Sequence, residues 1–232
     1  MATQGEIIED ARSRLDEETA VKFSDREIMR WINQAQQDIS RRAECNRDST
    51  TIAGVPGQTA YGLPNDATRI HIIEYQDASG YSYGILDYVD RHNFNIRSSG
   101  NSSTPVIYTT WGQPGSVASD FDLEVYPAPS DAGTFTVYYY SRPADLAIDG
   151  TDHDTELTLP AGWHDLVVDY VEMRAMRKDR DDRWREAQEW YNQNLLGLIE
   201  ASIRYSDQGG QWGENAVFGA PSWLVGFDGM YY

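Results

Sequence analysis

The chain has 232 residues and a formal net charge of −18, with 40% hydrophobic and 12% aromatic residues. This composition is typical of a folded protein with material for one large domain or two small ones. The 37 acidic residues against 19 basic ones disfavour tight DNA or RNA binding, which depends on clustered Lys and Arg. No apolar run approaches the roughly 18 residues needed to cross a membrane, and the first residues do not follow the pattern of a secretory signal.

The negative charge is spread along the whole chain, with −3 over residues 1–50, −7 over 51–150 and −8 over 151–232. The charge is therefore a property of the whole surface. It either serves solubility alone or gives a surface that DNA passes without sticking. The single cysteine, Cys45, excludes an internal disulfide framework, and we expect it near a helix end as a structural residue.

Two helices are predicted at the start. A short amphipathic helix carries Ile7, Ile8, Ala11 and Leu15. A second helix of about 20 residues follows Ser24, which we expect to form a capping box with Glu27 while Phe23 and Ile28 form a hydrophobic staple. Its apolar face is predicted from the spacing of Ile28, Trp31, Ile32, Ala35 and Ile39.

From about Asp48 the pattern changes to short segments rich in β-branched and aromatic residues, separated by Gly, Pro, Asn, Asp and Ser. Examples are "TRIHIIEYQD", "FDLEVYPAP" and "GTFTVYYYSRP". This spacing predicts an antiparallel sandwich or small barrel. The many tyrosines of these segments are expected to pack in the sheet.

Two further helices are predicted after Pro160. The first apolar stripe contains Trp163, Leu166, Val167, Tyr170 and Arg174. The second contains Trp184, Ala187, Tyr191, Leu195, Leu198 and Ser202, after an acidic start at Asp181 and Asp182 that suits a helix amino terminus.

The predicted fold class is therefore α+β, an antiparallel bundle of about four helices with an inserted antiparallel β-sandwich or small barrel and an extended C-terminal arm. We expect residues 1–47 and 160–206 to form the helical domain, 48–159 the β domain, and 207–232 the arm.

No phosphate-binding loop, nucleophile elbow or dinucleotide fingerprint is present, so we expect neither a catalytic residue nor a cofactor. His71 and His164 fit structural positions better than catalytic ones. The best metal candidate is an acidic loop containing Asp149, Asp152, Asp154 and Glu156. Counted from Asp152, the glycine and the final glutamate of a calcium loop are replaced by Leu157 and Trp163, which favours a solvated loop.

The last 24 residues combine six glycines and six aromatic residues with no Lys or Arg. Glycine makes ordering such a segment costly, so we expect it to become ordered by docking into a groove on a partner. The alternative is that it folds back over its own core. The expected anchors of the arm are Trp212, Phe218, Trp223, Phe227, Tyr231 and Tyr232.

Four segments, in their order and spacing, resemble the head-to-tail adaptor proteins of tailed bacteriophages. They are "WINQAQ" from Trp31, "YGLP" from Tyr61, "YSRPADL" from Tyr140 and "LPAGWH" from Leu159. The resemblance covers about residues 24–200. It implies a helical bundle with a β insertion and a structural, non-enzymatic role.

The resemblance also implies partners and a location. Proteins similar to these form a ring, typically of twelve copies, beneath the portal protein, and this ring carries the tail or nozzle protein. Genomic DNA passes through without specific binding, and no membrane is involved. The expected location is the virion neck, after assembly in the host cytoplasm. An acidic channel wall would repel DNA phosphates, which accounts for the net charge.

Two alternatives stay open. One is a carbohydrate-binding or carbohydrate-cleaving virion protein, suggested by the acidic and aromatic content. The other is a different connector component, such as a tail-completion protein.

Overall fold

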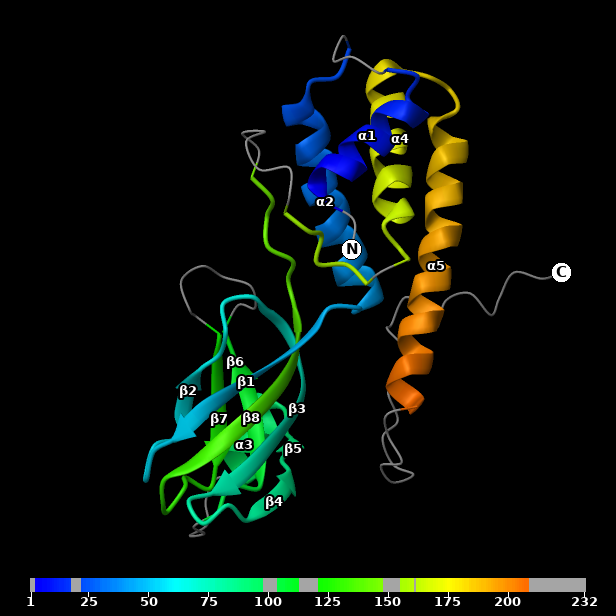
Figure 1. Cartoon of the computed structure of the whole chain (residues 1–232). Helices are drawn as coiled ribbons and strands as arrows, with labels where there is room; N and C mark the ends of the chain where they lie inside the picture. Colours follow the sequence, from blue (N-terminus) through cyan, green and yellow to red (C-terminus); the bar gives the residue numbers. More distant parts are fainter. Residues whose placement is uncertain are drawn as a thin grey trace, which may run out of the picture.

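The computed structural model describes residues 3–17, 22–97, 104–112, 121–147, 155–160 and 162–208. The chain is α+β, with α1, α2, α4 and α5 at one end and the strands, together with the short helix α3, at the other (Figure 1). Within the described residues the helices are α1 (Gln4–Arg14), α2 (Asp25–Ala43), α3 (Arg91–Arg97), α4 (Asp165–Asp179) and α5 (Trp184–Gln208). None of these described helices is both long and apolar enough to span a membrane.

The strands form two four-stranded sheets. Their bounds are β1 (Arg47–Gly54), β2 (Ala60–Gly62), β3 (Ala67–Asp77), β4 (Ser82–Ile85), β5 (Asp87–Tyr88), β6 (Ile107–Trp111), β7 (Asp122–Tyr126) and β8 (Gly133–Ser141). The sheet orders are β1-β8-β3-β4 and β2-β7-β6-β5. The expectation of a closed small barrel is therefore wrong.

One strand pair departs from the predicted antiparallel pattern. β5 pairs with β6 in parallel, while every other named pair is antiparallel within the described strands. The chain passes from β4 in one sheet to β5 in the other through the buried Leu86, without reversing direction. Because β4 and β5 run on in one line, β5 meets the second sheet in the parallel sense.

Each group of elements surrounds its own apolar core. α1, α2, α4 and α5 enclose one cluster that includes Ile32, Leu166 and Leu195. The two sheets enclose a second cluster that includes Ile73, Leu123 and Phe135. Burial of these side chains supplies most of the driving force for folding.

The second helix agrees closely with its prediction. The staple residue Phe23 and the five predicted core residues of α2 are all buried: Ile28, Trp31, Ile32, Ala35 and Ile39. The predicted capping box at its start is wrong. Ser24 occupies the N-cap position but makes no side-chain cap hydrogen bond, and the Glu27 carboxylate instead accepts from Lys178 at 2.6 Å.

A capping box that the sequence reading missed lies at α1. The Glu6 amide donates to Thr3 Oγ1 at 3.3 Å, and the Thr3 amide donates to Glu6 Oε2 at 2.9 Å. This box fixes the start of α1. Thr3 also forms a β-bridge with Glu156, which attaches the start of the helix to the segment before α4.

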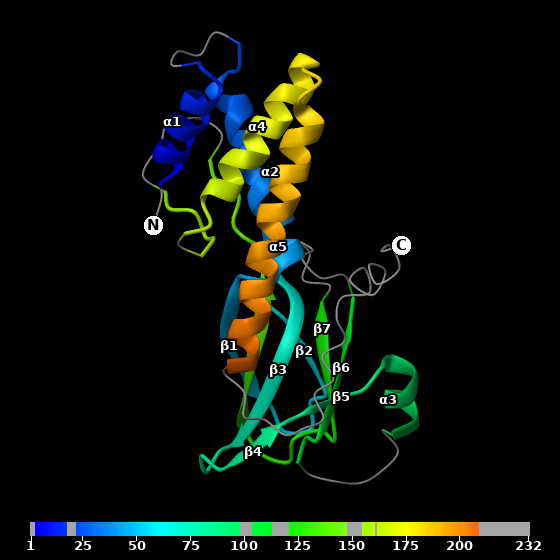
Figure 2. The same ribbon diagram turned by 90° about the vertical axis from the view of Figure 1, so that its right-hand side faces the viewer.

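The predicted helices after Pro160 are both present. Leu166, Val167, Tyr191, Leu195 and Leu198 are buried as expected. Trp163 lies before α4 rather than in it, and it packs on the face of α5, where a Cβ at Gly197 would lie 3.5 Å from the Trp163 ring. α5 is long enough to run past the other helices and alongside the strands (Figure 2).

The short helix α3 was not predicted. Its start is held by the Asp90 carboxylate, which accepts from the amides of His92 at 3.0 Å and Asn93 at 3.1 Å. Asp is a common N-cap residue, so Asp90 could have indicated the start of this helix from the sequence.

Candidate interaction surfaces

The first two residues of the predicted arm, 207 and 208, belong to α5, and residues 209–232 lie outside the described residues. All six of its aromatic anchors follow Gln208, the last residue of α5. Figure 1 places that end of α5 at the level of the strands, at the opposite end of the helix from α1. Any segment that continues from Gln208 therefore starts beside the β part of the molecule.

The predicted acidic loop is described only at its last member. Asp149, Asp152 and Asp154 lie outside the described residues, while Glu156 pairs through its backbone with Thr3. Within the described part of the chain, no group of three His, Cys, Asp or Glu residues could hold a metal ion.

The helices and strands are joined where α2 passes into β1. Arg47 donates to the carbonyl oxygen of Ser202 on α5 at 3.3 Å, and its guanidinium lies 5.8 Å from the centre of the Tyr140 ring. Arg69 on β3 binds the Glu44 carboxylate at 2.7 Å. These contacts tie α5, the end of α2 and both central strands of one sheet together.

Cys45 lies at this joint, directly after α2 and near the helix end as predicted. Burial raises the pKa of its thiol to about 11. The thiolate is the reactive form of cysteine, so Cys45 is an inert structural residue at neutral pH.

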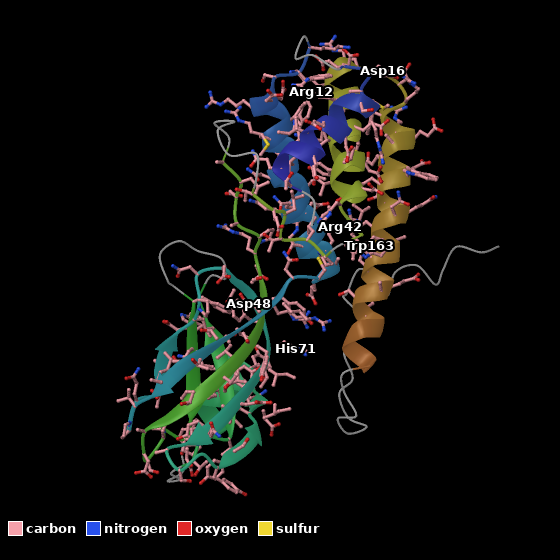
Figure 3. The ribbon with its side chains drawn as sticks, viewed as in Figure 1. Arg12, Asp16, Arg42, Asp48, His71 and Trp163 are labelled. Atoms are coloured by element: carbon pink, nitrogen blue, oxygen red, sulfur yellow. The ribbon has the colours of Figure 1, made fainter. Side chains whose placement is uncertain are left out.

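An open groove of about 520 Å³ lies beside the first half of β3, which pairs with β8 but not with β4. His71 and Thr68 mark two irregularities of the β3–β8 register, and both line the groove with Tyr108, Thr110 and Phe121. Burial lowers the pKa of His71, and the nearby Arg47 and Arg69 add to this effect. His71 also packs on Tyr140, which is the structural position predicted for it (Figure 3).

A row of exposed aromatic and apolar side chains follows the sheet edge at β4. Tyr81, Tyr83 and Ile85 alternate along the chain, and the Tyr81 ring packs on the Tyr83 ring with centres 4.9 Å apart. Edge strands usually carry charges or other devices that prevent pairing with another chain. This row is apolar, as expected of a surface that a partner covers.

A seam rich in arginine lies where α2, α4 and α5 meet. Tyr170 of α4 packs on Tyr191 of α5, with ring centres 5.4 Å apart. Tyr191 donates to the Asp38 carboxylate of α2 at 2.9 Å, and burial followed by this carboxylate raises the pKa of Tyr191. Around these rings and the nearby Trp184 lie exposed or half-buried arginines from all three helices, which we call the arginine seam: Arg41, Arg174, Arg177 and Arg185.

Sequence reasoning did not identify the arginine seam. Its signal was present in the solvent-facing position of Arg41 on α2. What the sequence could not provide was the pairing of α2 with α4 and α5, which brings Arg174, Arg177 and Arg185 to the same place.

The comparisons with known proteins give a family for most of the chain. Residues 2–216 match the family model described as SU10 adaptor protein. No curated protein matches the sequence.

Proposed function

Because the chain belongs to the SU10 adaptor protein family, a phage head-to-tail adaptor family, we propose that it is the ring component that joins the portal of a tailed phage to its tail. The family match over residues 2–216 is the observation that carries this proposal. It favours a structural role in the virion neck over carbohydrate binding or cleavage.

The ring is proposed to contain twelve copies, to sit beneath the portal protein and to carry the tail or nozzle protein. The helical elements would form one domain, residues 1–47 and 160–206, as an antiparallel bundle. Residues 48–159 would form an inserted β-sandwich. The separate apolar cores of the helices and of the sheets support this division.

The net charge of −18 supports a channel that DNA passes without binding. A wall rich in carboxylates repels phosphates, so the genome gains no stable contact during packaging or ejection. We propose that a good share of the 37 acidic residues line this channel or its approaches. A ring structure whose lumen carries mainly Lys and Arg would contradict this.

The test is to mix the purified chain with the portal protein of the same phage and to measure the mass of the complex by native mass spectrometry. The expected result is a complex that contains a fixed number of adaptor copies per portal. A chain that shows no association with the portal at any ratio would contradict the proposal.

The arm can be tested by ending the chain after Gln208. We propose that residues 209–232 dock on a partner, so the shortened chain should keep its melting temperature and fail to join the portal or tail complex. A second variant replaces only Trp212 and Trp223 with Ser in the full-length chain, and it should show the same loss of docking. Global unfolding of the shortened chain would instead place the arm on its own core.

A further inference from the structure

The arginine seam is a positive surface on a strongly negative chain. Three of its arginines have no carboxylate partner among the described residues: Arg174, Arg177 and Arg185. Two of them, Arg177 and Arg185, each lie 5.4 Å from the centre of the Trp184 ring, which orients the two guanidinium groups. Arginines gathered in one place and not paired within the chain are available to bind carboxylates of another molecule.

Two carboxylates near the seam are already bound within the chain. Asp38 accepts from Arg41 at 3.1 Å and from Tyr191 at 2.9 Å. Glu27 is held by Lys178 at 2.6 Å. These two acids therefore do little to neutralise the three unpaired arginines.

A complementary surface lies on the other side of α4. Arg14 of α1 binds Asp169 and lies 3.6 Å from Glu172, which places α1 on one side of α4. Tyr170 and Arg174 point instead to the meeting of α2 and α5. α1 also contacts α2, because the Gln4 side chain donates to Met29 Sδ at 3.1 Å and Arg12 binds Asp25.

The outward side of α1 is acidic. Of its exposed residues, Glu6, Glu9 and Asp10 are acidic, Ser13 is neutral, and Arg14 is basic but bound to Asp169, and the turn after the helix adds one more acid. We call the four acids the acidic row: Glu6, Glu9, Asp10 and Asp16. Glu9, Asp10 and Asp16 have no basic partner among the described residues.

We infer that the arginine seam of one copy binds the acidic row of α1 on the next copy. This inference rests on the proposed ring and names the surfaces that close it. A ring needs two different surfaces of one chain that meet head to tail, and the two surfaces here lie on opposite sides of α4. Copies that each carry −18 repel one another, so a contact between opposite charges is needed where they touch.

The inference is tested by exchanging charges between the two surfaces. The seam variant carries Arg177→Glu and Arg185→Glu, and the row variant carries Glu9→Arg and Asp10→Arg. All four side chains are exposed, so both variants should fold, which circular dichroism checks. Assembly is measured by native mass spectrometry in the presence of the portal protein.

In a ring made of either variant alone, like charges would meet at every contact between copies. The amount of assembled ring should therefore fall by about tenfold or more. An equal mixture of the two variants has opposite charges in every contact again, and rings that alternate the two should return. Raising the salt concentration should weaken both the wild-type and the mixed rings, because it screens these contacts.

The control variant carries Asp48→Arg and Asp131→Arg, two exposed acids of the β part, and should assemble like the wild type. Variants that assemble normally, or a mixture that does not recover, would overturn the inference while leaving the adaptor function intact. So would a seam variant that forms rings but loses binding to the portal or to double-stranded DNA. Failure of the wild type itself to assemble on the portal would count against the proposed ring.

Discussion

Single glycines in this chain differ sharply in the space around them. A Cβ built at Gly133, the first residue of β8, would lie 2.5 Å from Tyr75 Oη and 2.6 Å from the backbone oxygen of Gln76. The tyrosine could move, but the backbone of a paired strand could not move without loss of its hydrogen bonds. Gly133 is therefore a position where the close approach of two strands requires glycine.

Replacing Gly133 with Ala should lower the free energy of unfolding by about 1–3 kcal/mol, because the new methyl group forces β3 and β8 apart. Urea denaturation followed by fluorescence measures this change. Gly62→Ala is the matched control, since nothing lies within 4 Å of a Cβ at that strand position. Equal stability of the two variants would show that the sheet adapts to the added methyl.

At the same scale, individual contacts explain where the sequence reading failed. The Ser24–Glu27 capping box is absent because Glu27 binds Lys178, a residue 151 positions away. A side chain in a local capping motif can instead bind a residue that is distant in the sequence. Only the folded structure shows which of the two partners it binds. The box at Thr3 and Glu6 had the same spacing and could have been read from the sequence.

Among the elements, α5 is unusual for its length of 25 residues and for a glycine in its middle. Glycine in a helix interior is less favourable than alanine by roughly 0.5–1 kcal/mol. At Gly197 an added Cβ would lie 3.5 Å and 3.7 Å from two carbons of the Trp163 ring, which is ordinary contact.

Gly197→Ala should therefore stabilise the chain, by about 0.5–1 kcal/mol. Thermal unfolding followed by circular dichroism would detect the rise. The same substitution in a Trp163→Ala background tests whether the ring limits the gain. A clear loss of stability in the single variant would mean that Trp163 cannot accept the methyl.

Helices with a clear helical spacing of apolar residues could be predicted from the sequence. Features that depend on which elements pack together could not. α2 followed from five apolar residues on one face, all of them buried. The parallel pairing of β5 with β6 could not be read, because it depends on how the chain crosses from one sheet to the other at Leu86. The arginine seam was missed for the same reason, since its members come from three helices.

Across the whole molecule, the two apolar cores raise the question of whether the helices and strands unfold together. Ile32 in α2 and Ile73 in β3 are both fully buried, one in each core. The link between the cores is polar, through Arg47, Glu44 and Ser202.

Replacing either isoleucine with Ala should cost about 2–5 kcal/mol through lost burial and a cavity. If the proposed domains are independent, Ile32→Ala should raise amide hydrogen exchange in the helices and leave the strands protected. Ile73→Ala should do the reverse. Exchange that rises equally everywhere in both variants would show one cooperative unit and contradict the proposed division.

The burial of Cys45 has a practical consequence for studying assembly. A thiol whose pKa is about 11 is slow toward maleimide at neutral pH, and it is the chain's only native one. A cysteine introduced at an exposed site, such as Ser13→Cys on α1 or Gln188→Cys on α5, would therefore take up a fluorophore selectively without deletion of the natural residue. Donor-labelled and acceptor-labelled copies could then report by energy transfer which faces of neighbouring copies come together.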